Sequence, residues 1–256
     1  ALAQTPAYPT KTVKVILPFG PGSATDVITR VLTDELKNIY GQPFIIDYKD
    51  GASGRIGAEA AAKSAPDGYT LFVGTNSTHS ANASLFKKLN YDPLKDFAPI
   101  SHLVAYTSVF IAHPNAPFNN VKEMIDYARA NPGKLAYASA GIGSYFHMTG
   151  EMFKSAAKLD ILHVPYKGVP PALTGLAGGQ VQMMFVSAFS AKAVEGKIKV
   201  LGVNEAQRYA GLPNVPAIAE VVPSFEKLPT WYAFFGPAGM PRPIVARLNG
   251  EMNKSL

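Results

Sequence analysis

The sequence predicts an α/β protein built from two lobes. Strand-like apolar runs alternate with helical patterns along almost the whole chain, which is typical of parallel or mixed sheets flanked by helices. A strand, a glycine turn and a helix follow one another between Val13 and Tyr40, and the same order recurs between Leu135 and Ala157. This repeat within 256 residues, with no low-complexity linker, indicates two lobes that face a shared cleft.

The strand predictions rest on short apolar runs bounded by turn residues. These runs are Val13–Leu17, Phe44–Asp47, Thr70–Val73, Ser108–Ala112, Leu135–Ala138, Ile161–Val164, Val181–Val186 and Lys197–Val203. A further aromatic strand is expected around Trp231 and Phe235. The helix predictions rest on apolar residues that recur every three or four positions. These helices are Asp26–Tyr40, Ile56–Ser64, Val121–Asn131, Tyr145–Ala157, Ala172–Ala177 and Pro243–Asn253.

Composition excludes several functions. The net charge of +6 comes from scattered Lys and Arg residues without a basic stripe, so we expect no nucleic-acid partner. The chain has no Cys, which removes disulfides, thiolate metal sites and thiol nucleophiles, and it has no apolar run of about 18 residues that would cross a membrane. The residues Ala1-Leu2-Ala3 have the A-x-A form that precedes signal-peptide cleavage. Export to the periplasm is therefore predicted, and no cofactor is expected.

The first glycine loop, residues 20–23, lies between a predicted strand and a predicted helix. Backbone N–H groups and the helix dipole attract anions at such a place. The loop falls one residue short of a dinucleotide fingerprint, because Thr25 stands at the third glycine and Asp26 would repel a pyrophosphate. Asp26 instead suits the first helical turn and can pair with Arg30. The loop is predicted to hold a small anion, with a purely structural turn as the alternative.

The second glycine loop offers N–H and hydroxyl donors at Ser139, Gly141, Gly143 and Ser144, with no Arg or Lys. Donors of this kind suit a carboxylate held by neutral groups. Ser144 is equally compatible with a plain helix N-cap. A nucleophile and base at Ser144 and His147 is the alternative from another class, a periplasmic serine hydrolase, but no G-x-S-x-G elbow surrounds any serine. His147 with Glu151 has metal-pair spacing but lacks further ligands, so no metal is predicted.

Two other regions carry open alternatives. The polar loop Gly74–Asn82 either caps the next helix or forms a third wall of the cleft, and we favour the wall. Aromatic residues of the second lobe pack in the core or line the cleft; they are Tyr145, Phe146, Phe185 and Phe189. If two of them line the cleft, an aromatic or longer dicarboxylate is expected.

Four separated motifs resemble the Bug-type (TctC) solute receptors, which are extracytoplasmic binding proteins of tripartite tricarboxylate transporters. They are "PFGPGSATDVITR", "GYTLFVGTNSTHSANASLFKKLNYDPLKDFAPI", "HVPYKGVPPALTGLAGGQVQMMF" and "LPNVPAIAEVVPSF…WYAFFGPAGMPRPIVARLN". The resemblance runs from about Tyr8 to the C-terminus. It implies a two-lobed clamshell, with residues 1–102 and 230–256 in one lobe and 103–229 in the other.

The resemblance also implies a function without catalysis. A receptor of this kind captures a small carboxylate and presents it to membrane subunits, acting as a monomer. A dicarboxylate is expected, with an aromatic one as the alternative. Its expected ligand-binding residues in the first lobe are Gly20, Gly22, Ser23, Ala24, Asp26, Thr75, Asn76 and Thr78. Those in the second lobe are Ser139, Gly143, Ser144, Tyr145, Phe146, Phe185 and Ser187.

Three departures from the family pattern stand out. The family's Pro-Gly-Gly is Pro21-Gly22-Ser23 here, which adds a side chain where the ligand is expected. Its Val-Asp before a late strand is Val181-Gln182. Members continue past the position of Leu256 with another helical segment, so the resemblance predicts further residues there.

Overall fold

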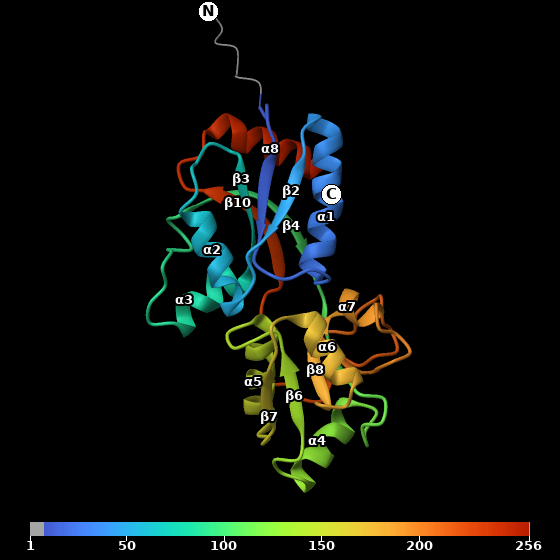
Figure 1. Cartoon of the computed structure of the whole chain (residues 1–256). Helices are drawn as coiled ribbons and strands as arrows, with labels where there is room; N and C mark the ends of the chain where they lie inside the picture. Colours follow the sequence, from blue (N-terminus) through green and yellow to red (C-terminus); the bar gives the residue numbers. More distant parts are fainter. Residues whose placement is uncertain (1–7, 256) are drawn as a thin grey trace, which may run out of the picture. The chain divides into compact units, whose positions relative to one another are not determined.

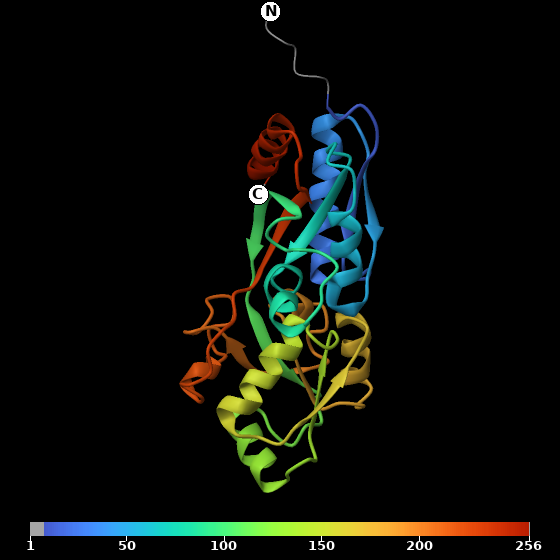
Figure 2. The same cartoon turned by 90° about the vertical axis from the view of Figure 1, so that its left-hand side faces the viewer.

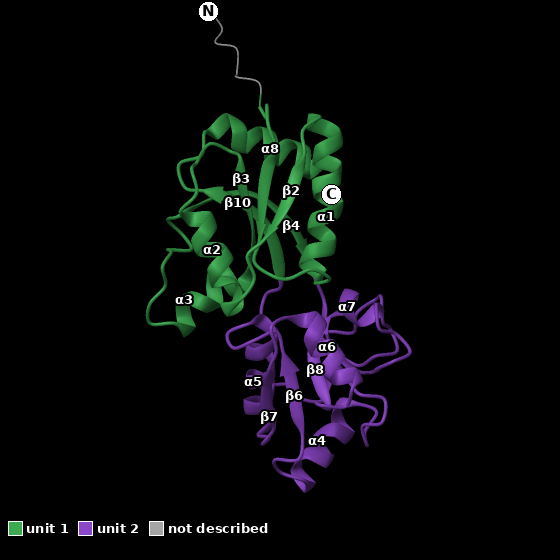
Figure 3. Ribbon diagram, in the orientation of Figure 1, with its two compact units in different colours: residues 1–105, 231–256 green, residues 106–230 purple. Residues whose placement is uncertain are grey.

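The chain forms two compact units in a computed structural model that describes residues 8–255. Unit 1 comprises the residues up to 105 and from 231 onward, and unit 2 comprises residues 106–230 (Figure 3). The sequence analysis put these divisions at 102/103 and 229/230. The first division comes three residues later because a paired strand continues to Ala105. The expected cleavage site near Ala3 lies outside the described residues.

Sheet 1, in unit 1, has the strand order β2-β1-β3-β10-β4. Its parallel part consists of β1 (Val13–Leu17), β2 (Phe44–Tyr48) and β3 (Thr70–Thr75). Strand β10 (Trp231–Pro237) lies between β3 and β4 (Phe97–Ala105) and is antiparallel to both. The sequence predicts an aromatic strand at β10 but not β4, because Pro99, Ser101 and His102 interrupt the apolar run of β4.

The helices of unit 1 are α1 (Ala24–Tyr40), α2 (Arg55–Ala62), α3 (Asn82–Leu85) and α8 (Arg242–Ser255). Helix α1 starts two residues earlier than predicted and ends at Tyr40, followed by the cap residue Gly41, whose φ of 67° suits glycine. Helices α1 and α8 pack against each other, and α1 also packs on β2 and α8 on β4 (Figure 1). Helix α2 packs on β3, β1 and β10. The turned view shows α8, in red, beside the green strand β4 (Figure 2).

Sheet 2, in unit 2, has the strand order β7-β6-β8-β5-β9. Strands β6 (Ala136–Ser139), β7 (Leu162–Pro165) and β8 (Met183–Ser187) are parallel. Strand β5 (Ser108–Ala112) is antiparallel to β8 and to β9 (Lys199–Asn204). Each sheet thus has a central parallel strand that leads into a long helix, and an antiparallel strand in the fourth position.

The core of unit 2 lies on both faces of sheet 2. Side chains alternate between faces along a strand, and Phe110 and Phe185 on β5 and β8 pack into one cluster with helices α4 (Val121–Ala130) and α5 (Tyr145–Ala157). Their neighbours Ile111 and Val186 pack into a second cluster with α6 (Val169–Ala177). This two-sided burial explains why the strands read as continuous apolar runs.

A short helix α7 (Ala188–Lys192) follows β8 and completes unit 2. Residue Gln182, a departure from the family pattern, accepts the N–H group of Ala136 at 2.9 Å and so ties the start of β6 to β8. Across residues 8–255, no helix combines the length and apolarity needed to cross a membrane.

Candidate functional site

The first cradle, residues 20–26, joins β1 to α1. Gly22 has a φ of 79°, a left-handed conformation that favours glycine. Ser23 is the extended N-cap of α1, and its Oγ accepts the N–H of Asp26 at 3.2 Å. The added side chain of Ser23 therefore caps the helix.

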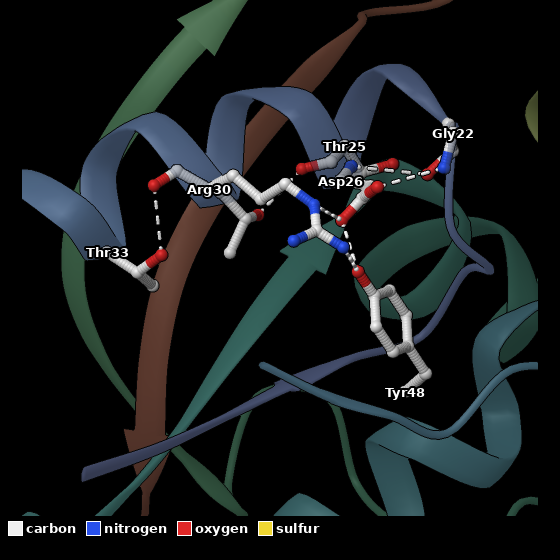
Figure 4. Close-up of polar contacts among 8 residues, drawn as sticks. Gly22, Thr25, Asp26, Arg30, Thr33 and Tyr48 are labelled. Carbon is white, nitrogen blue, oxygen red and sulfur yellow. Dashed lines mark hydrogen bonds and ion pairs between the residues drawn. The ribbon is translucent and has the colours of Figure 1, made fainter. Parts of the chain in front are cut away.

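The Asp26 side chain bonds to the backbone of the first cradle and to side chains beside it (Figure 4). Its carboxylate, on a residue only 3% exposed, accepts the N–H of Gly22 at 2.9 Å and the hydroxyl of Tyr48 at 2.5 Å. Arg30 Nε lies 3.0 Å from the same carboxylate, which confirms the predicted pair one turn along the helix. Burial alone would raise the pKa of Asp26, but the bonds from Tyr48, Gly22 and Arg30 outweigh it and hold the pKa below its usual value.

The second cradle, residues 139–147, repeats this geometry between β6 and α5. Gly143 has a φ of 84°, and Ser144 is an extended N-cap whose Oγ accepts the N–H of His147 at 3.3 Å. The Gly143 N–H donates to Nδ1 of His147 at 3.1 Å. The two cradles thus share a G-x-G-S turn, and His147 occupies the position that Asp26 has in the first.

Several of the N–H groups that the sequence predicts to bind a ligand donate instead to acceptors within the two turns. Ser23 N donates to Gly20 O at 3.4 Å and Ser144 N donates to Gly141 O at 3.1 Å, while the Gly22 and Gly143 N–H groups bond to Asp26 and His147. In the first turns of α1 and α5, one or two positions further on, the N–H groups of Ala24, Thr25 and Phe146 have no acceptor within residues 8–255. Unpaired N–H groups of a first helical turn favour an anion.

A histidine pair supports the second cradle. The ring of His163, on β7, lies 4.2 Å from the ring of His147 between centroids, and its Nε2 is 2.7 Å from Ser139 Oγ. Ser139 Oγ also accepts the N–H of Gly141 at 3.1 Å. Burial lowers the pKa of His147, and burial together with His147 lowers the pKa of His163 to about 4. Both imidazoles are therefore neutral at pH 7.

A hydroxyl pair follows the third parallel strand of each sheet. After β3, Thr75 N donates to Thr78 Oγ1 at 2.9 Å, and Asn76 lies buried between them. After β8, Ser190 N donates to Ser187 Oγ at 3.1 Å. In both units this polar pair lies at the carboxyl end of the strand beside the glycine cradle.

The four candidate aromatic residues of unit 2 differ in their solvent exposure. Phe185 is 1% exposed and stacks on Phe110 at 4.4 Å between ring centroids, inside the core. Tyr145 and Phe146 are also buried, and the Tyr145 hydroxyl accepts from Asn204 Nδ2 at 3.0 Å. Phe189 alone among the four is exposed, at 52%. Core packing thus accounts for the side chains of Tyr145, Phe146 and Phe185.

The alternative hydrolase arrangement is not formed. Ser144 Oγ meets the backbone N–H of His147, and Nδ1 of the ring is already occupied by Gly143. Glu151 accepts bonds from Tyr137 at 2.7 Å and Lys154 at 3.0 Å. Within the described part of the chain, no three His, Asp or Glu side chains gather as a metal site would require.

Sequence reasoning missed two supporting side chains and one loop. Tyr48 is the last residue of β2, which pairs with β1, and His163 is the second residue of β7, which pairs with β6. Parallel pairing of neighbouring strands could have indicated both. The missed loop joins β2 to α2, where Ala52 and Ser53 have φ values of 48° and 55°. The backbone of Ser53 accepts Asn82 Nδ2 at 3.2 Å, which links this loop to the segment after β3.

This repeated α/β unit, with an N-capped helix after its first strand, is the architecture of periplasmic solute-binding proteins. Residues 28–256 match the model of the tripartite tricarboxylate transporter family receptor, TctC. The chain belongs to this family. Since its members are solute-binding receptors, the chain is a receptor rather than an enzyme.

Several relatives of known name or structure share this fold. BugT of Bordetella pertussis is 34% identical over 253 residues, which cover 97% of this chain and 77% of BugT. An R. palustris protein solved with adipate has a TM-score of 0.92 at 35% identity, covering 96% of this chain and 83% of its own. MatC from Rhodopseudomonas palustris, solved with malate, has a TM-score of 0.91 at 35% identity, covering 97% and 85%. The periplasmic binding protein BugD gives 0.91 at 32%, covering 97% and 83%.

Proposed function

We propose that this chain is a monomeric periplasmic receptor that binds a small aliphatic dicarboxylate and delivers it to the membrane subunits of a tripartite transporter. The observation that carries the proposal is the pair of matching glycine cradles, with two unpaired N–H groups at the N-terminus of α1 and one at the N-terminus of α5. Each cradle is proposed to donate to a carboxylate, through Ala24 and Thr25 in unit 1 and through Phe146 in unit 2. The A-x-A sequence at Ala1–Ala3 supports export.

The choice of an aliphatic ligand rests on two observations. Three of the four candidate aromatic side chains are buried within unit 2, which leaves Phe189 as the exposed one. Two relatives at 35% identity were solved with adipate and with malate. An aromatic dicarboxylate is the second candidate, and it would require Phe189 to contact the ligand.

Calorimetry against adipate, malate and phthalate tests the ligand class. Binding of adipate or malate without conversion into a product supports the proposal. Phthalate binding tighter than both, weakened by Phe189→Ser, would favour the aromatic candidate. Turnover of a bound acid would refute the receptor function itself.

Ala24→Pro tests the N–H donors directly. Proline fits the first helical position, and Ser23 before it already has the extended backbone that proline requires, so the helix is expected to persist. Loss of one charge-assisted hydrogen bond should weaken binding by about tenfold or more. Ala24→Gly keeps the N–H and is the matched control, expected near wild-type affinity. Equal affinities of a folded Ala24→Pro protein and this control would remove Ala24 from the site.

A further inference from the structure

In the second cradle, the Gly143 N–H is bonded to a side chain that gains a positive charge in acid. Nδ1 of His147 accepts the Gly143 N–H at 3.1 Å, and it can do so only while that nitrogen carries no proton. In the first cradle the equivalent N–H, that of Gly22, is bonded to the carboxylate of Asp26. The lowered pKa of Asp26 keeps that carboxylate charged throughout the range in which histidine titrates. The two otherwise matching loops therefore differ in their response to acid.

A second imidazole is tied to the same loop. His163 stacks against His147, and Ser139 Oγ connects His163 Nε2 to the N–H of Gly141. Protonation of one ring places a positive charge 4.2 Å, between centroids, from the other ring, which disfavours a positive charge on both rings at once.

The surrounding groups do not offer His147 an alternative partner when it is protonated. The charged neighbours on its own helix are Glu151 and Lys154, which pair with each other at 3.0 Å. From β6, the Tyr137 hydroxyl bonds to Glu151 at 2.7 Å and to His147 O at 3.2 Å. Within residues 8–255, no hydrogen bond joins the Glu151 carboxylate to the His147 ring. When His147 is protonated, its Nδ1–H and the Gly143 N–H are both donors that face each other, and the hydrogen bond between them is lost.

We propose that His147 is a positioning residue that holds the second cradle in its closed shape only as a neutral imidazole, with His163 as its stacked support. Acid conditions then open the second cradle while the first cradle stays closed. As a consequence, the ligand affinity decreases as the pH is lowered, and it does so more steeply than protonation of the ligand explains. This consequence for affinity rests on the proposed function, whereas the opening of the loop does not.

The loop is tested without ligand by NMR. The Gly143 and Gly22 amide signals and the imidazole carbon-bound protons are followed from pH 7.5 to pH 4.5. The Gly143 amide should shift together with the His147 ring, at a midpoint below 6.5, while the Gly22 amide stays constant above pH 5. His147→Asn, which keeps an acceptor oxygen near the place of Nδ1 but does not titrate, should abolish the Gly143 shift. A Gly143 amide that does not follow the His147 ring, or still titrates in His147→Asn, would overturn the proposal.

His113→Asn is the matched control. Nδ1 of His113 also accepts a backbone N–H, that of Asn115 at 3.1 Å, but it lies on the loop after β5 and outside the cradle. This variant should leave the Gly143 titration unchanged.

The affinity arm uses adipate and calorimetry. Wild-type affinity should be about twofold weaker where His147 is half protonated and about tenfold weaker for each further pH unit, relative to His147→Asn at the same pH. The protonation of adipate itself is identical for both proteins and cancels in this ratio. Equal pH profiles of wild type and His147→Asn would refute the link to binding. If adipate does not bind at pH 7.5, the choice of ligand fails, and the NMR arm still decides the behaviour of the loop.

Discussion

Asp26→Asn should destabilise unit 1 strongly, although the side chain keeps its size. The carboxylate accepts the Gly22 N–H on one oxygen and the Tyr48 hydroxyl and Arg30 Nε on the other. An amide has one acceptor and one donor end, so its NH₂ group must face one of these two sets of donors. At a residue that is 3% exposed, water cannot readily separate them.

The expected loss is about 2–4 kcal/mol in the free energy of unfolding. A hydrogen bond to a charged group contributes about 1.5–3 kcal/mol, and one such bond is lost while the other becomes neutral. Removing a negative charge from the first turn of α1 adds about 0.3–1 kcal/mol. The Arg30 side chain is 56% exposed, and its ion pair adds little.

Urea unfolding followed by tryptophan fluorescence measures this loss in the appropriate unit, because Trp231 is the one tryptophan of the chain and lies in unit 1. Asp34→Asn is the control, since Asp34 is exposed on the same helix of unit 1 and its replacement should change stability by less than about 0.5 kcal/mol. The stability contributed by Asp26 is present above its unfolded pKa of 3.8 and is lost as pH falls through the lower folded value. A difference below about 0.5 kcal/mol at pH 7, or one that disappears by pH 6, would refute this reasoning.

Three further changes test other parts of the structure. Burial lowers the pKa of His79 to about 4, so the free energy of unfolding of the wild type should decrease from pH 6.5 downward, by up to about 3 kcal/mol. His79→Phe should remove this decrease between urea titrations at pH 7 and pH 5. An unchanged pH dependence would exclude His79 as its source. Ala52→Gly should stabilise unit 1 by about 0.5–1 kcal/mol, because Ala52 is exposed with a φ of 48°, and a lower midpoint in urea would contradict the strain. Gly150→Ala should lower the melting temperature and destabilise by about 1–3 kcal/mol, since its new Cβ would lie 2.2 Å from the Tyr137 ring; a wild-type melting temperature would show that the ring can move freely.

The sequence predicted the local features of the site well because those features depend on neighbours in the chain. The N-cap role of Ser144 and the Asp26–Arg30 pair follow from spacing within one helical turn, and the structure confirms both. The recurrence of strand, glycine turn and helix was also visible. The match of the two turns in backbone angles was not visible, because φ and ψ cannot be read from a sequence pattern.

Contacts between distant segments were beyond the sequence. Tyr48 reaches Asp26 only because β2 pairs in register with β1, and His163 reaches His147 only because β7 pairs with β6. The sequence also assigned the N–H groups of Gly22 and Gly143 to a ligand. Their actual acceptors are side chains four residues later, and this depends on rotamers that the pattern does not reveal.

The position of β10 in the chain sets the order in which the two units can fold. Strand β4 pairs only with β10 in sheet 1, and β10 emerges after all of unit 2. Until then β3 and β4 expose unpaired edges, which are prone to aggregation. Sheet 2 is complete once Asn204 has been made. We therefore expect unit 2 to fold before unit 1, the reverse of the usual N-terminal-first order, with sheet 1 left incomplete until Trp231–Pro237 arrives.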